Sequence, residues 1–369
     1  AGLGSFSDVF PRATAACGAP FVLTEPQFTN PANNPQVILP QIFPGTGGAL
    51  STIGLPAAIQ QDIRIPFSMQ YNVTLEHQRW DTGFRLSYIG TNTRQGEWGH
   101  DINSPLPGSA PYVDKPRMFP RYPSVTYFGN GAGPQYHSMQ AEMERRFMSG
   151  LSYQLSWTWA RDIGALDRGA QPENPYDRRR ERGVWLDIPT HRVTGNLIYE
   201  LPFGRGKTFF TGATGLLNQV AGGWELSAIY SYYSGQFLTP SWTGPDPVGI
   251  AFTSSRTAPN VTLRPDILRD PNLPKDQRTP GRWFDTTAFA PPRPGSFGTS
   301  SRGTIIGPDS AVWSFALMKT FRISEQARIR ADILAENALN RANYSLPNTN
   351  IADLGTIGVI SAALAILRR

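Results

Sequence analysis

The stretch Gly150-Leu-Ser-Tyr-Gln-Leu-Ser-Trp-Thr-Trp-Ala160 decides the fold class of this chain. Apolar and polar side chains alternate along it, and the apolar ones are Tyr153, Leu155, Trp157 and Trp159. Because neighbouring side chains of a strand point to opposite faces, one face of this segment is apolar and aromatic and the other is polar. A strand that crosses a membrane needs about 9–11 residues, an apolar outer face, and Trp or Tyr at the level of the headgroups. The stretch has all three features and therefore predicts a transmembrane β-strand.

The composition of the 369-residue chain excludes several protein classes. With 40% hydrophobic and 17% charged residues, it is not a disordered chain. No run approaches the roughly 18 apolar residues of a membrane helix, which excludes a helical membrane protein. The net charge of +6 comes from basic residues that are scattered and mixed with acids. This pattern favours a solvated surface and is compatible with contact to outer-membrane lipid and lipopolysaccharide, whereas nucleic-acid binding is not expected.

The same alternation recurs along the chain and predicts antiparallel hairpins. The predicted strands are 71–76, 84–88, 135–147, 150–160, 191–201, 224–234, 312–321, 327–337 and 357–367. The helix propensities of segments 141–147 and 332–338 are also compatible with helices. We interpret both as strands because a tight turn connects each of them to a more clearly alternating strand. Bacterial barrels have even strand numbers, so a tenth strand is expected among or before residues 1–60, a loop-rich lead-in with at most one strand.

The lengths of the connections predict how the strands are placed in a membrane. Short turns alternate with Pro- and Gly-rich loops, and the long loops are 91–134, 161–190 and 235–311. Outer-membrane barrels have brief periplasmic turns and extended outer loops. We therefore predict an all-β, antiparallel transmembrane β-barrel segment over 61–369, with these loops outside the cell. Aromatic residues at the inner and outer strand ends are expected at the membrane interfaces, and they are Phe147, Phe203 and Phe321 (inner) and Tyr88, Trp157, Trp159 and Tyr232 (outer).

Several phrases in this order resemble one receptor family. They include Tyr136-His-Ser-Met-Gln-Ala-Glu-Met-Glu-Arg-Arg-Phe147, Asp187-Ile-Pro-Thr-His-Arg192, Trp283-Phe-Asp-Thr-Thr-Ala-Phe-Ala290 and Ala335-Glu-Asn-Ala-Leu-Asn340. Over roughly residues 60–350, the chain resembles the C-terminal β-barrel part of a TonB-dependent outer-membrane receptor, in the branch with a carboxypeptidase-regulatory-like N-terminal domain. The resemblance implies a plugged, 22-stranded barrel in the bacterial outer membrane that imports a bulky nutrient, of which this chain supplies about 9–10 strands.

The resemblance also implies partners. No plug domain and no segment that contacts a TonB-type energy-coupling protein is visible in the sequence, and the chain ends in Arg369 where barrels usually end in Phe. It opens with Ala-Gly-Leu-Gly, without an initiator Met or a signal. We therefore expect an N-terminal plug and the remaining barrel strands outside this sequence, and contact with the TonB-type protein through that part.

Charged residues in two places are candidate site residues. On the polar faces of predicted strands, the candidates for the barrel lumen are Glu142, Glu144, Arg328, Arg330, Asp332 and Glu336. In a plugged barrel such residues hold the plug by ion pairs and hydrogen bonds. In the loop 161–190, the candidates for binding an anionic ligand or lipopolysaccharide are Arg178, Arg179, Arg180 and Arg182; a solvated, salt-bridged loop is the alternative.

Metal sites, cofactors and catalysis are not expected. Cys17 is the single cysteine, and the four histidines show no metal-ligand spacing. The favoured function is a non-enzymatic receptor. Two alternatives remain: a structural or assembly barrel without transport, and a small autonomous barrel enzyme with a rim pair such as His100-Asp101.

Overall fold

The computed structural model describes residues 2–7, 57–120, 122, 124–165, 172–186, 188–250, 262–324 and 326–364. Most of the predicted lead-in 1–60 therefore lies outside the described residues. Within the described part, no helix has the length and apolar character needed to cross a membrane.

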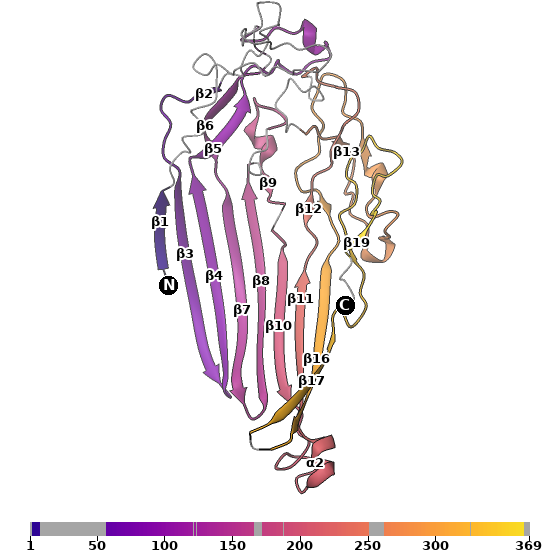
Figure 1. The fold of residues 1–369 in the computed structure, drawn as a ribbon. Coiled ribbons are helices and arrows are strands. Elements are labelled where there is room, and N and C mark those ends of the chain that lie inside the picture. Colours follow the sequence, from indigo (N-terminus) through magenta and orange to yellow (C-terminus); the bar gives the residue numbers. More distant parts are fainter. Residues whose placement is uncertain are drawn as a thin grey trace, which may run out of the picture.

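One large antiparallel sheet forms the body of the molecule (Figure 1). Its strands, in spatial order, are β1 (Gly2–Ser7), β3 (Phe67–Arg79), β4 (Thr82–Arg94), β7 (Gln135–Met148), β8 (Leu151–Gly164), β10 (His191–Glu200), β11 (Trp224–Tyr233), β16 (Ser310–Arg322) and β17 (Arg328–Ala335). The short β9 (Gly183–Val184) extends the sheet beside the end of β8. The predicted strands up to 327–337 are confirmed, and β1 is the expected strand of the lead-in.

Tight turns join the strands at one end of the sheet, at the bottom of Figure 1. Trp80 and Asp81 both have positive φ, 50° and 59°, as the two central residues of a type I′ turn require. Ser149 and Gly150, with φ of 54° and 80°, form the corresponding turn between β7 and β8. The right-handed twist of such turns matches that of the flanking strands, so both hairpins are fixed in register locally.

The register gives the sheet two chemically different faces. One face is apolar: a row of cross-strand neighbours runs over it from β3 to β10, and its members are Leu75, Leu86, Ala141, Trp157 and Val193. The other face is polar: the hydroxyls of Thr74 and Ser87 lie 3.0 Å apart, and those of Ser156 and Thr194 lie 2.7 Å apart. Because the side-chain period is two, a slip by one residue would exchange these faces, so the pattern specifies the register.

The connections at the other end fold into a cap (Figure 1). On one side, β5 (Gly96–Asp101) and β6 (Thr126–Ala132) pair antiparallel, and β2 (Ala57–Ile59) joins β6 in parallel. On the other side are three short ladders: β12 (Phe237–Leu238) with β15 (Ile305–Ile306), β13 (Asp266–Ile267) with β14 (Phe289–Ala290), and β18 (Asn343–Tyr344) with β19 (Ala363–Leu364). The 3-10 turns are η1 (Tyr112–Asp114), η2 (Arg178–Glu181), η3 (Lys275–Gln277) and η4 (Thr286–Ala288).

The cap has its own hydrophobic core. Phe284 and Ile305 are 1% and 0% exposed, and Phe284 packs edge-to-face on Phe289 with ring centres 6.1 Å apart. Trp283, the neighbour of Phe284, belongs to the same cluster, and Ile360 joins it from the C-terminal part of the chain. The long Pro- and Gly-rich loops are therefore held by apolar packing of their own.

Four features of the structure correct or extend the sequence-based expectations. The segment 357–367 does not add a strand to the large sheet: Ile360 packs into the cap core, and only β19 forms, beside β18; residues 365–369 lie outside the described part. The strand predicted to 338 ends with β17, and residues 336–339 form a turn. The connection 202–223 contains the helix α2 (Gly215–Ala221) at the short-turn end. The fourth correction concerns the outer aromatics.

The outer aromatics divide into two groups because the strands run further than the alternation predicted. Tyr88, Trp157 and Trp159 lie within β4 and β8, not at their ends, since these strands continue to Arg94 and Gly164. Tyr232 is next to the last residue of β11. Among the inner aromatics, Phe147 and Phe321 are next to the last residues of β7 and β16, and Phe203 follows β10. A place at the membrane interface remains a prediction for all seven.

Candidate functional site

A cavity of about 750 Å³ lies between the polar face of the sheet and the cap. The strands β7, β8, β10, β11 and β16 supply one wall, lined by Tyr136, Gln140, Thr158, Arg192, Tyr233 and Ser310. Loop and C-terminal segments supply the other wall, lined by Ile188, Pro189, Gln236, Pro308, Tyr344 and Leu346. The cavity thus combines three tyrosines, hydroxyl and amide groups, and one charged residue.

Backbone hydrogen bonds position both walls. The Ser234 hydroxyl accepts a hydrogen bond from the backbone N–H of His191 at 2.9 Å, which ties the ends of β10 and β11 together. On the other wall, Asn343 is 2% exposed and its side-chain oxygen accepts the backbone N–H of Ala311 at 2.9 Å. The next residue, Tyr344, lies with its ring centre 6.4 Å from that of Trp283 in the cap core. The cavity wall and the core of the cap are therefore one packed unit.

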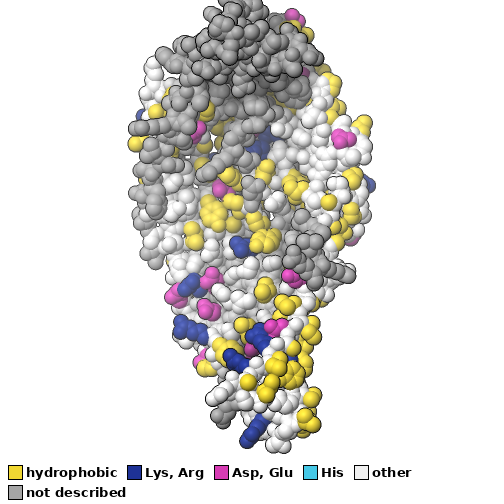
Figure 2. All heavy atoms as spheres, in the orientation of Figure 1, with side chains coloured by type: hydrophobic (Ala, Val, Ile, Leu, Met, Phe, Trp, Pro, Cys, Tyr) yellow, Lys and Arg dark blue, Asp and Glu magenta, His cyan; other side chains and the backbone are white. Residues whose placement is uncertain are grey.

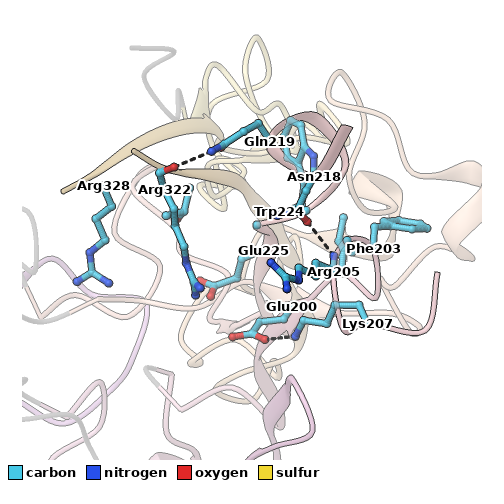
Figure 3. A pocket seen from close by; sticks show the side chains of 15 residues that line it. Glu200, Phe203, Arg205, Lys207, Asn218, Gln219, Trp224, Glu225, Arg322 and Arg328 are labelled. Atoms are coloured by element: carbon cyan, nitrogen blue, oxygen red, sulfur yellow. Dashed lines mark hydrogen bonds and ion pairs between the residues drawn. The ribbon is translucent and has the colours of Figure 1, made fainter. Parts of the chain in front are cut away.

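A second cavity, of about 360 Å³, lies at the short-turn end beside α2 (Figure 3). The register places Arg322 opposite Arg328 and Glu200 opposite Glu225. Glu200 forms an ion pair with Lys207 at 2.6 Å. Figure 3 shows the long side chains of Arg322 and Arg328 extending to the same side. Like charges directly across a ladder repel each other, and Lys207 offsets part of this repulsion on the Glu200 side.

A buried ion cluster in the cap joins the loops 161–190 and 235–311. The Arg264 guanidinium, 2% exposed, contacts the Glu173 carboxylate at 2.6 Å and the Glu181 carboxylate at 3.1 Å. Arg180 also reaches Glu173, at 2.9 Å. Burial raises the pKa of Glu181, against the opposing effect of Arg264. No sequence pattern marked Glu173 or Arg264, because they meet only in the folded cap.

The predicted basic run is divided among several contacts. Arg180 belongs to the ion cluster, while Arg178 donates to the backbone carbonyl of Asn130 at 3.1 Å. Arg182 donates to the Gln135 side-chain oxygen at 2.9 Å. Arg179 has an exposed side chain. None of the four lines the cavity under the cap. A role in gripping an anionic ligand remains a prediction.

Five of the six residues predicted to face the lumen lie on the polar face of the large sheet, and the exception is Glu336. Their neighbours follow from the register and the ion pairs: Glu142 contacts Arg85 at 3.2 Å, Glu144 lies opposite Gln154, and Arg330 contacts Asp332 at 2.7 Å. Arg328 lines the second cavity, and Glu336 lies in the turn after β17. Figure 2 shows charged side chains gathered over the strands, nearer the short turns than the cap. Contact with a plug remains a prediction for all six.

The residues His100 and Asp101 do not form an acid–base pair. The Asp101 carboxylate accepts the backbone N–H groups of Asn103 and Val125, both at 2.8 Å. The His100 ring packs against Tyr127 with ring centres 5.5 Å apart, and its Nδ1 is buried. Burial lowers the pKa of His100 and raises the pKa of Asp101. The two side chains thus serve the packing of the small β5–β6 sheet.

Among solved structures, the chain is similar to parts of outer-membrane transporters. The outer-membrane transporter YddB from Escherichia coli is similar over 84% of this chain and 33% of its own, with 10% identity and a TM-score of 0.42. The FrpB iron transporter from Neisseria meningitidis is similar over 83% of this chain and 31% of its own, with 9% identity and a TM-score of 0.35. The chain thus spans about a third of the length of these solved proteins. No curated protein matches.

The family model described as an outer membrane beta barrel domain matches residues 1–369. An antiparallel sheet with one apolar and one polar face, short turns at one end and long loops at the other, is the architecture expected of such a barrel. The predicted outer-membrane β-barrel and its predicted location in the outer membrane are thereby confirmed. The chain belongs to the outer-membrane β-barrel family and lies in the bacterial outer membrane.

Proposed function

We propose that this chain forms part of the wall and the outer cap of a receptor that takes up a bulky nutrient, and that the cavity under the cap captures the ligand. The observation behind the proposal is the place of the cavity: it lies on the polar face of the sheet, directly beneath the long loops. In a barrel whose apolar face contacts lipid, the polar face lines the lumen. A ligand that passes the loops would therefore meet this cavity first.

The cap is suited to selecting a ligand because its shape is preformed. Phe284 and Ile305 are fully buried, and the ion pair of Arg264 with Glu173 links two loops. Binding sites of small molecules are concave, largely preformed and about 300–1,000 Å³ in volume, a range that includes this cavity.

The open edges of the sheet support the presence of partner strands. Within the described residues, β1 and β17 each pair on one side only. In a membrane every backbone polar group needs a hydrogen-bond partner, so a spanning sheet must close into a barrel. We infer that remaining barrel strands cover these edges and that a plug, with the TonB-type protein that drives it, completes the transporter.

Filling the cavity tests the proposal in the bacterium that makes this protein. We would compare a deletion strain, Ser310→Trp, and the control Ser314→Trp, which lies four residues along β16 outside the cavity lining. Growth would be measured on panels of iron chelates, cobalamin, oligosaccharides and peptides as limiting nutrients. The proposal predicts that deletion and Ser310→Trp abolish growth on the same nutrient, while Ser314→Trp grows normally.

The two alternatives give different results in this experiment. A structural barrel predicts no nutrient-specific defect but an envelope that leaks dyes or antibiotics after deletion. An enzyme predicts that a supplied compound is converted by purified protein. The receptor proposal would be overturned if the deletion strain grew normally on every nutrient and either envelope leakage or enzymatic conversion were observed.

A further inference from the structure

We propose that the cavity under the cap binds an anionic group, a carboxylate or a phosphate, of a ligand whose ring or planar part lies against the tyrosines. This inference rests on the proposed function, because it names the ligand class of the same cavity. It assigns Arg192 as the residue that pairs with the anion.

Among the described residues that line the cavity, Arg192 is the one that carries a charge. The register surrounds it with uncharged groups: Thr158 lies opposite on β8 and Tyr233 lies opposite on β11. Beyond these lie Gln140 and Ser310, which continue the same row across the polar face. Among the described residues, the lining of the cavity therefore carries a single positive charge and no carboxylate.

The acids of the polar face near this row form no ion pair with Arg192: Asp162 lies opposite Tyr136 at the end of β8, and Glu142 has a cationic partner of its own. Glu142, on the row of residues next to that of Arg192, forms an ion pair with Arg85 at 3.2 Å. Arg85 is itself shared with Glu76 at 2.8 Å. Across the described part of the chain, Arg192 has no carboxylate within ion-pair distance. Its guanidinium carbon lies 5.4 Å from the centre of the Tyr233 ring.

This contact orients Arg192 without occupying its hydrogen-bond donors. A guanidinium over an aromatic face keeps its N–H groups in the plane of the fork, where they match two oxygens of a carboxylate or phosphate. Such charge-assisted, bidentate hydrogen bonds are about twice as strong as neutral ones. A cavity whose described lining offers this cation and no acid favours anions over cations.

The tyrosines define the second half of the ligand. Tyr136, Tyr233 and Tyr344 come from β7, β11 and β18, so they approach the cavity from different segments. Aromatic rings offer flat apolar faces with a polar hydroxyl at the tip, and they stack on planar or ring-shaped groups. The ligand would thus place its ring among the tyrosines and its anion on Arg192.

Binding of small probes to the detergent-purified outer-membrane protein that contains this chain tests the inference. The probes are phenyl phosphate and benzoate, with benzyl alcohol and benzylamine as neutral and cationic counterparts, and inorganic phosphate alone. Affinities would be measured by calorimetry and by saturation-transfer NMR at low and high salt. We expect the two aromatic anions to bind, benzylamine not to bind, and the affinity for phenyl phosphate to fall as salt rises.

Variants assign the binding to the cavity. Arg192→Gln is expected to weaken phenyl phosphate binding by about tenfold or more, and Arg192→Lys to retain part of it. The matched control is Asn196→Ala, on the same strand and face but outside the cavity lining. The affinity of this control variant for phenyl phosphate should equal that of the unchanged protein.

The outcomes separate this inference from the proposed function. If benzyl alcohol binds as well as the anions and Tyr344→Ala abolishes that binding, the cavity is a ligand site but the anionic class is wrong. If Arg192→Gln binds phenyl phosphate unchanged, Arg192 is not the anion site. If Ser310→Trp leaves every growth phenotype intact, the receptor function itself fails, whatever the probes do.

Discussion

Arg264 and Glu173, 91 residues apart in the sequence, form a buried ion pair that joins two outer loops. Both side chains are 2% exposed, and the Glu173 carboxylate also accepts the backbone N–H of Arg264 at 2.9 Å. A carboxylate removed from water needs such partners, because burial of an unpaired charge is costly. The pair therefore holds the cap together only while both members are present.

Arg264→Met should destabilise the cap by about 3–5 kcal/mol, because it leaves the carboxylates of Glu173 and Glu181 buried without their shared cation. Denaturant unfolding in detergent and protease sensitivity of the loops would measure the loss. The control is Arg293→Met, since Arg293 is 72% exposed and its contact with Asp266 is 3.3 Å long. An exposed pair of this kind contributes about 0–1 kcal/mol. Equal effects of the two substitutions would contradict the importance of burial.

Leu155→Arg should impair insertion of the protein into a membrane, while Gln154→Arg should not. The two residues are neighbours on β8, but Leu155 lies on the apolar face with Leu86 and Trp157, whereas Gln154 lies on the polar face. Arg at the lipid face near the membrane centre costs about 2–4 kcal/mol. Folding into phospholipid vesicles, followed by the gel mobility of unboiled samples, would measure this. Normal folding of Leu155→Arg would contradict the assignment of the faces.

The stability of the cap should fall at acid pH through Asp285. Its side chain caps η4 by accepting from Thr287 and pairs with Arg269 at 2.8 Å, and these contacts hold its pKa below the ordinary value of 3.8. A carboxylate with a lowered pKa in the folded state stabilises the protein above its ordinary pKa. That contribution is lost as the pH falls below 3.8 and through the lowered pKa.

Asp285→Asn provides the measurement. The difference in unfolding free energy between the unchanged protein and this variant should be constant above about pH 5 and shrink below the ordinary aspartate pKa. Denaturant unfolding from pH 2.5 to 7 would follow it. A difference that grows as the pH falls would show that the sign is wrong.

Arg328→Glu should stabilise the hairpin of β16 and β17. It replaces the cross-strand pair of two arginines with an opposite-charge pair to Arg322, a change that is favourable by about 0.2–1 kcal/mol. Hydrogen exchange of the amides in this hairpin would measure the gain. Arg330→Glu is the informative contrast, because it removes the 2.7 Å contact with Asp332 and places two acids together. It should destabilise the same hairpin, and a gain from both variants would point to a general effect of lowering the positive charge.

The sequence by itself determined the parts of the fold that depend on near neighbours. Alternation along segments such as 150–160 predicts strands because the side-chain period of a strand is two, and it assigns Leu155 and Gln154 to opposite faces. Tight turns such as Trp80-Asp81 then predict which strands pair. The family phrases agreed with this pattern, and the family model matches the whole chain.

Only the tertiary structure decided the cap and the cavity. The segment 357–367 has the length and apolarity of a strand, yet Ile360 is buried in the cap, since a short apolar run does not distinguish a strand from a buried loop. The ion pair of Arg264 with Glu173 joins two distant loops, and one cavity is lined by both Arg192 and Tyr344; no local period relates these segments. Local periodicity depends on residues two to four positions apart, whereas these sites arise from packing between distant loops, which only the folded chain brings together.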